Sequence, residues 1–88
     1  MNASNNEIRV YSLPDCPKCD TLKEWLKTEG IEYEAKWFDT EAQTDFIMRN
    51  FFDNPPILAK NDIAKGAEDL FEGEKLKEDY LTEVLGIG

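Results

Sequence analysis

Residues 8–31 read IRVYSLPDCPKCDTLKEWLKTEGI, in which three local patterns follow one another. A short apolar run predicts a buried strand over residues 7–12, and Pro14 ends it. Pro17 suits the first turn of a helix, where its missing N–H costs nothing, and Gly30 suits the end of that helix. Apolar residues at spacings of three and four form one helical face, namely Cys19, Leu22, Trp25 and Leu26.

The next stretch predicts a second strand and a second helix. Residues 31–38 alternate, with Ile31, Tyr33, Ala35 and Trp37 on one side and charged residues on the other. Asp39 or Thr40 can cap the following helix. The expected apolar side of this helix consists of Phe46, Ile47 and Phe51, and Phe52 can extend it.

The remainder predicts two short strands and a final helical region. Asp53-Asn54-Pro55-Pro56 breaks the second helix, and residues 57–59 predict a third strand. Asn61-Asp62 predicts a hairpin turn to a fourth strand over 63–65. A helix is expected from Ala67 to Phe71, with an interruption at Gly73 and an apolar side that continues to Gly86.

This order, βαβ-α-ββ-α, predicts an α/β fold with a four-stranded mixed sheet flanked by helices. A helical crossover makes the first two strands parallel, and the hairpin adds antiparallel strands. The 88 residues are enough for one small domain, 1–88, in which the polar residues 1–6 are expected to be flexible.

Charge and hydropathy narrow the function classes. The formal net charge is −9, without a basic tail or stripe, so neither nucleic acid nor an anionic membrane surface is an expected partner. There is no apolar run of about 18 residues that could span a membrane. The first seven residues are polar and do not look like a secretory signal. The expected location is the cytoplasm, where thiols are kept reduced.

Cys16-Pro17-Lys18-Cys19 contains both cysteines of the chain. A CxxC beside a βαβ pattern is typical of a redox motif. Cys16 falls at the expected helix start, where free N–H groups and the helix dipole favour a thiolate. Cys19 lies one turn further and can resolve a mixed disulfide formed by Cys16. Lys18 adds a nearby cation that favours the thiolate further.

Other interpretations of the two cysteines stay open. A structural disulfide across three residues would close too short a loop to stabilise the fold much. A zinc site needs four ligands, and the chain has two Cys and no His, so a thiolate–imidazole site within one chain is excluded. A zinc or iron–sulfur site shared by two chains, or a pair of inert buried cysteines, is a further alternative.

Four short motifs stand in a defined order between Ile8 and Leu85. They are Val10-Tyr11-Ser12 followed by Cys16-Pro17-Lys18-Cys19, then Gly30-Ile31-Glu32-Tyr33, Pro55-Pro56-Ile57-Leu58 and Gly66-Ala67-Glu68-Asp69-Leu70. In this order and spacing they resemble glutaredoxins and related small redoxins of the thioredoxin superfamily. The resemblance implies a thioredoxin-like fold. It also implies that Cys16 is the nucleophile and Cys19 the resolving thiol, that Pro17 and Lys18 tune them, and that Pro56 is a cis-proline packed against the dithiol.

The resemblance further implies a thiol-substrate site at Pro55, Gly66, Ala67 and Glu68. In the family, the residue before the cis-proline pairs with the bound thiol or peptide through its N–H and C=O; Pro55 retains only the carbonyl. Ala67 and Glu68 match positions that hold the γ-glutamyl end of glutathione, and N–H groups at a helix start can bind its carboxylate. An ordinary trans loop at Pro55-Pro56 and a simple helix cap at Gly66 are the alternatives.

Three departures from the family pattern weaken the case for glutathione in particular. Leu13 replaces a common basic residue, Lys18 replaces the usual aromatic residue between the cysteines, and Lys65 replaces the first glycine of a Gly-Gly pair. Lys18 and Lys65 are either replacement cations for an acidic thiol or ordinary solvated lysines. The electron donor is therefore glutathione, another small thiol or a flavoprotein reductase.

The sequence thus predicts a thiol–disulfide oxidoreductase that reduces protein or low-molecular-weight mixed disulfides. No bound cofactor or metal is expected; a thiol such as glutathione acts as co-substrate, and the expected state is a monomer. One alternative is a dimer that binds an iron–sulfur cluster through one cysteine of each chain and external thiols. Another is a regulatory adaptor that uses the same fold without turnover.

Overall fold

The computed structural model describes residues 8–60 and 63–86. Strand β1 (Ile8–Ser12), helix α1 (Pro17–Thr28) and strand β2 (Glu34–Trp37) form the first unit. β1 and β2 are parallel neighbours, so the predicted strand–helix–strand unit is confirmed. The expectation for residues 1–6 and the turn expected at Asn61-Asp62 lie outside the described residues.

The remaining elements complete the sheet and add three helices. They are α2 (Thr40–Met48), β3 (Ile57–Lys60), β4 (Ile63–Lys65), α3 (Ala67–Leu70), β5 (Phe71–Glu72), β6 (Lys75–Leu76) and α4 (Glu78–Leu85). The main sheet has the order β2-β1-β3-β4, and β3 is antiparallel to both β1 and β4. The predicted four-stranded mixed sheet is therefore confirmed. No helix in the described part of the chain is long and apolar enough to cross a membrane.

Helix α1 begins and ends at the residues that its sequence predicts. Cys16 is the N-cap and Pro17 occupies the first helical turn. Glu29 is the C-cap, and Gly30 follows with φ of 73°, a left-handed conformation that glycine adopts without steric cost. Because the helix starts sharply at Pro17, Cys16 has a fixed position at its N-terminal end.

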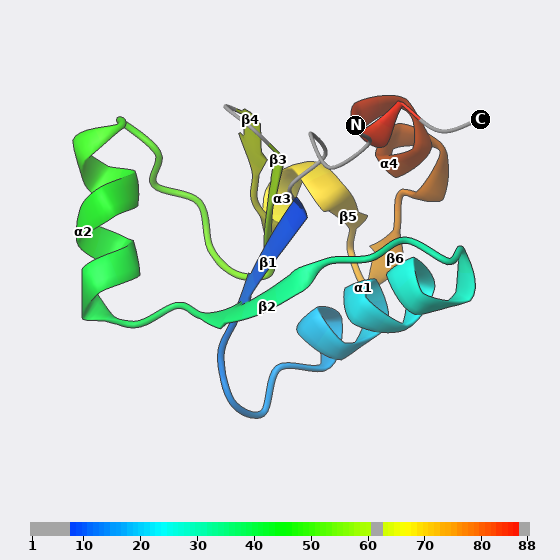
Figure 1. Ribbon diagram of the computed structural model, residues 1–88, viewed down its shortest axis with the longest axis horizontal. Helices are drawn as coiled ribbons and strands as arrows, with labels where there is room; N and C mark the ends of the chain where they lie inside the picture. The colour runs from blue at the N-terminus through cyan, green and yellow to red at the C-terminus, as the bar shows by residue number, and fades with distance from the viewer. Residues whose placement is uncertain (1–7, 61–62, 87–88) are drawn as a thin grey trace.

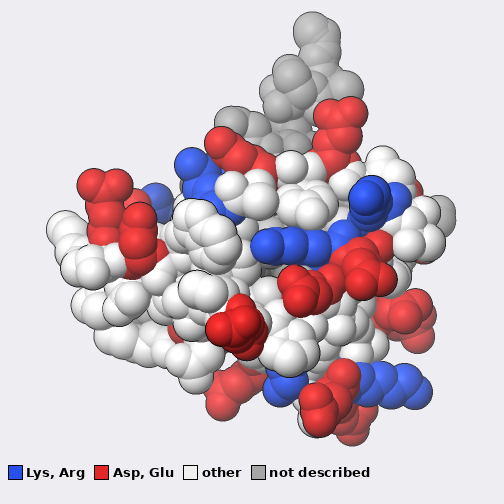
Figure 2. Space-filling model, turned by 90° about the horizontal axis from the view of Figure 1, so that it is seen from below, with Lys and Arg blue, Asp and Glu red and all other residues white. Residues whose placement is uncertain are grey.

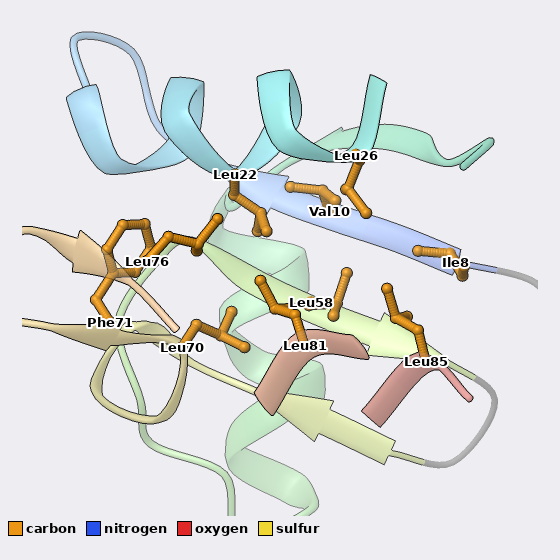
Figure 3. Close-up of a cluster of buried hydrophobic side chains, with 10 residues drawn as sticks. All are labelled: Ile8, Val10, Leu22, Leu26, Leu58, Leu70, Phe71, Leu76, Leu81 and Leu85. Atoms are coloured by element: carbon orange, nitrogen blue, oxygen red, sulfur yellow. The ribbon is translucent and has the colours of Figure 1, made fainter. Parts of the chain in front are cut away.

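The hydrophobic core lies between the sheet and the pair α1 and α4, while α2 lies on the other side of the sheet (Figure 1). Alternation in β1 turns Ile8 and Val10 toward this core and Arg9 away from it. Figure 3 shows leucines of α1 and α4 meeting the side chains of β1 and β3. Trp25, predicted to be a core residue, is half-buried and packs against this cluster.

The predicted apolar side of α2 is only partly correct. Phe46 is buried and packs on Tyr11 of β1, with their ring centroids 4.9 Å apart in an edge-on arrangement. Ile47 and Phe52, in contrast, are 53% and 69% exposed. Consecutive helical residues point about 100° apart, so Ile47 cannot share the direction of Phe46. Phe52 lies beyond the end of the helix, where the periodicity no longer applies.

The prediction of the second strand is too long at its start. Residues 31–33 precede β2, because the N–H of Ile31 donates to the carbonyl of Leu26 and ties this residue to the end of α1. β2 is an edge strand, and all four of its residues are exposed.

The predicted interrupted helix after residue 66 is also wrong in part. Helix α3 stops at Leu70, and β5 and β6 form an antiparallel hairpin instead of a continued helix. Gly73 turns the chain with φ of 64°, and the paired residues Phe71 and Leu76 both bury their side chains in the core. This shared burial explains why the hairpin forms in place of a helix.

Lys60 links the end of β3 to the end of α4. Its Nζ donates a 2.6 Å hydrogen bond to the carbonyl oxygen of Leu85, one of the last carbonyls of the helix. We expect Lys60→Met, which retains the apolar stem, to lower the free energy of unfolding by about 1–2 kcal/mol. Urea denaturation of the variant checks this prediction. The exposed Lys75→Met serves as the control, and equal stability of the two variants would contradict the role of Lys60.

Candidate active site

Cys16 and Cys19 are joined by a disulfide, with their Cα atoms 5.2 Å apart. Cys16 is half-buried at the N-cap of α1, whereas Cys19 in the first turn is only 1% exposed. The two sulfur atoms are therefore unequal in access. Only Cys16 offers partial access to a molecule that approaches from outside.

The sulfur of Cys16 accepts a hydrogen bond from the backbone of α1. The N–H of Cys19 donates to Cys16 Sγ over 3.2 Å, and this sulfur is the side-chain acceptor that caps the helix. Sγ thus occupies the place where an oxygen of serine or aspartate usually accepts from the first turn. After reduction of the disulfide, the same N–H and the positive end of the helix dipole stabilise a thiolate at Cys16.

The chain enters this cap through an unusual backbone conformation. Asp15 has φ of 55°, in the left-handed region that aspartate tolerates better than most residues. Asp20 closes the first turn from the other side, donating its N–H to the carbonyl of Cys16 over 3.1 Å. The loop between β1 and α1 lies at the bottom of the view in Figure 1, and Cys16 ends this loop as the N-cap of α1.

Lys18 is held against an aromatic ring. Its Nζ lies 5.6 Å from the ring centroid of Phe71, within the range of a cation–π interaction. Phe71 is buried and belongs to β5, so this contact joins the segment between the cysteines to the small hairpin. No local pattern in the sequence pointed to Phe71, because the contact depends on a hairpin that the sequence did not predict.

The predicted cis-proline is present: the peptide bond between Pro55 and Pro56 is cis, and Pro56 is buried. Pro55 lies beside Cys16, in a pocket of about 370 Å³ that we call the disulfide pocket. Its lining is largely apolar and consists of Leu13, Pro14, Asp15, Cys16, Pro17, Lys18, Pro55 and Glu74. Four of these were not predicted as site residues, namely Leu13, Pro14, Asp15 and Glu74.

The predicted thiol-binding residues lie next to this pocket. Ala67 and Glu68 line a neighbouring pocket that also includes Lys18 and Pro55, so the two pockets adjoin at these shared residues. The N–H of Ala67, however, donates to the carbonyl of Asn54 over 3.0 Å. The expectation that this N–H is free to bind a carboxylate is therefore wrong, because the loop before Pro55 already uses it.

Gly66 has a packing role at this loop. It is buried, and a Cβ placed on it would overlap Cβ of Asp53 and lie 2.8 Å from Asp53 Oδ2. Its φ of −94° is accessible to any residue, so close approach and not backbone freedom requires a glycine. The Gly66 position brings the start of α3 against the segment that carries Pro55 and Pro56.

We expect Gly66→Ala to lower the free energy of unfolding by about 1–3 kcal/mol, because the new methyl group has no space beside Asp53. Chemical denaturation of the purified variant measures this change. Adding Asp53→Gly removes the Cβ that the methyl group meets and should restore part of the loss. Equal stability of Gly66→Ala and the natural chain would contradict the close packing.

Charges of both signs border the disulfide pocket. Asp15 and Glu74 contribute carboxylates and Lys18 an ammonium group. Figure 2 views the molecule from the side of the β1–α1 loop and shows acidic and basic side chains around uncharged surface that continues toward α2. Trp37 is 62% exposed and does not line the disulfide pocket; Lys23 Nζ lies 5.9 Å from its ring centroid.

Solved structures match this arrangement, although no protein-family model and no curated protein matches the sequence. The thioredoxin-like protein BC3987 has a TM-score of 0.69 at 22% identity, covering 89% of this chain and 99% of its own. A point mutant of it has a TM-score of 0.71 at 24% identity, with coverages of 93% and 97%. The chain has a thioredoxin-like fold. The glutaredoxin-like protein NrdH-redoxin from Escherichia coli also matches, with a TM-score of 0.58 at 20% identity and coverages of 68% and 80%.

The thioredoxin-like fold confirms what the glutaredoxin resemblance implied for the architecture. The mixed sheet of this chain, with α1 starting at the cysteine pair, agrees with the thioredoxin-like description of the structures that it matches. Within this thioredoxin-like fold, the CxxC, the cis-proline and the start of α3 converge from three separate segments. The close cysteine pair in this setting is suited to thiol–disulfide redox chemistry.

Proposed function

We propose that the protein is a thiol–disulfide oxidoreductase that reduces protein disulfides through Cys16 and Cys19. The observation that carries this proposal is the inequality of the two sulfurs. Cys16 caps α1 and lines an open pocket, while Cys19 is buried directly behind it. A half-accessible attacking thiol and a protected resolving thiol are what a dithiol mechanism requires.

The proposed reaction proceeds in two exchanges. The thiolate of Cys16 attacks one sulfur of the substrate disulfide, forms a mixed disulfide and releases the other substrate sulfur as a thiolate, which takes up a proton. Cys19 then loses its proton and attacks Cys16 Sγ, which releases the second substrate thiol. Two electrons pass to the substrate and leave the Cys16–Cys19 disulfide, which a donor of two electrons must reduce again.

We propose a flavoprotein reductase, and not glutathione, as that donor. Two of the three backbone donors that the glutaredoxin resemblance associates with glutathione are missing here, since Pro55 has no N–H and the N–H of Ala67 donates to the carbonyl of Asn54, which leaves that of Glu68. One structural neighbour is itself described as a glutaredoxin-like protein with a thioredoxin-like activity profile. The proposed setting is a reducing compartment such as the cytoplasm, with disulfide-containing proteins as partners and no bound cofactor.

The choice of donor can be tested by coupled reduction of a peptide disulfide. We expect turnover with NADPH and a thioredoxin-reductase-type flavoprotein, and at least about tenfold slower turnover with glutathione and its reductase, equivalent to the loss of one good hydrogen-bonding contact. As a control, the Cys16–Cys19 disulfide of the purified protein is reduced chemically, which identifies a preparation that is inactive for other reasons. Faster turnover with glutathione would show that the donor assignment is wrong while leaving the dithiol mechanism intact.

A further inference from the structure

A second cleft, of about 340 Å³, lies between the sheet and α2. β1 contributes Arg9 and Tyr11, β2 contributes Lys36, and Arg49 follows the last turn of α2. In the parallel register Tyr11 lies beside Lys36 and Arg9 beside Glu34, so these residues share the sheet face that points away from the core. We call this the arginine cleft, and it shares no lining residue with the disulfide pocket.

The charges in the arginine cleft are unusual for this molecule. The chain has a net charge of −9 and only two arginines, Arg9 and Arg49, and the fold brings both to one cleft. Two carboxylates, Glu34 and Asp45, also line it. Glu34 lies 3.6 Å from Lys36 Nζ, and this is the only ion pair between residues of the described ranges. Neither guanidinium group is therefore paired with a carboxylate there.

Arg9 also contains a buried donor without a partner. Its Nε is inaccessible to solvent and forms no hydrogen bond with any residue that the structure describes. Most buried polar atoms in folded proteins are hydrogen-bonded, and a buried N–H that is left unpaired costs free energy. Tyr11, two residues further along β1, packs on Phe46 of α2, so Arg9 lies on the sheet face that α2 covers.

We propose that the arginine cleft binds a small oxyanion, through a phosphate or carboxylate group. A planar guanidinium presents its N–H donors in a fork that matches two oxygens of such a group. With three cations and two carboxylates, the lining favours one compact anionic group over an extended polyanion. The volume is near the lower limit of small-molecule sites, which start at roughly 300 Å³. This site is additional to the proposed redox function and does not depend on it.

The proposal can be tested by titration with inorganic phosphate, and separately with acetate, followed by ¹H–¹⁵N NMR at constant ionic strength kept with chloride. We expect saturable shifts of the amides of β1, β2 and the end of α2 with at least one of the two anions. Arg49→Gln changes an exposed residue and should weaken binding about tenfold, as expected for one lost charge-assisted contact. Its disulfide-reducing activity should stay unchanged.

Lys75→Gln is the matched control, since it removes one exposed cation on β6, outside the cleft. It should leave binding unchanged. Saturation by phosphate alone would identify a phosphate group as the ligand, and saturation by acetate alone a carboxylate. Shifts that rise linearly with both anions, or equal weakening by Arg49→Gln and Lys75→Gln, would overturn the proposal by showing only a general effect of charge.

Discussion

Cys16→Ser should abolish disulfide reduction, lowering the rate by about a thousandfold or more, as loss of a catalytic nucleophile does in other enzymes. A serine hydroxyl at the cap of α1 can still accept the N–H of Cys19, so the helix start is preserved. It cannot attack a disulfide, because a hydroxyl stays protonated under conditions that ionise a thiol. The coupled reduction of a peptide disulfide with the flavoprotein donor measures this loss directly.

A matched control is available on the same turn of the helix. Asp20 is exposed, its side chain is not part of the disulfide pocket, and Asp20→Ser should retain most of the activity. Circular dichroism of Cys16→Ser confirms that the fold is intact before the loss is interpreted. Activity that survives in Cys16→Ser but disappears in Cys19→Ser would reverse the roles of the two cysteines.

Most of the architecture could be predicted because its signals are local. Pro17 and Gly30 delimit α1 from inside their own turns, and Asp39 caps α2 as its position predicts, accepting from the N–H of Ala42. The apolar run that starts at Ile8 predicts β1 as a buried strand, and Ile8 and Val10 are buried in the core. Each of these features depends on residues no more than a few positions apart.

The parts that could not be predicted depend on residues far apart in the chain. The β5–β6 hairpin forms because Phe71 and Leu76 bury their side chains in a core that α1, α4 and the main sheet build. The N–H of Ala67 is taken by Asn54, thirteen positions earlier, and only the close approach of Gly66 to Asp53 brings them together. Arg9 and Arg49 meet only once α2 has packed on the sheet.

The same distinction applies within the candidate site. The motif at residues 16–19 identified the two cysteines, and the helical spacing that placed Cys19 on the apolar face of α1 agrees with its burial in the structure. The resemblance located Pro55 and Ala67 near the cysteines, and the structure confirms that they lie together. It did not show that their backbones lack free donors. That absence, and not the cysteine motif, is what favours a reductase over glutathione as the donor.

Cys19→Ser should stop the reaction after its first exchange and trap the substrate on the protein. Cys16 retains its position at the cap of α1 and still forms the mixed disulfide, but no second thiol remains to release it. An external thiol has poor access to the pair from the side of Cys19, whose position is 1% exposed. In the absence of glutathione, we therefore expect steady turnover to be lost and close to one equivalent of covalent adduct to accumulate.

Mass spectrometry under non-reducing conditions detects that adduct at the mass of the protein plus one thiol half of the substrate disulfide, less two hydrogen atoms. The double variant Cys16→Ser, Cys19→Ser is the matched control and should give no adduct. A buried serine hydroxyl without a partner costs about 1–3 kcal/mol, so Cys19→Ala provides a second variant if the first is too unstable. Full turnover by either Cys19 variant without added thiol would contradict the dithiol mechanism, because an intact rate requires that release of the substrate does not depend on the buried sulfur.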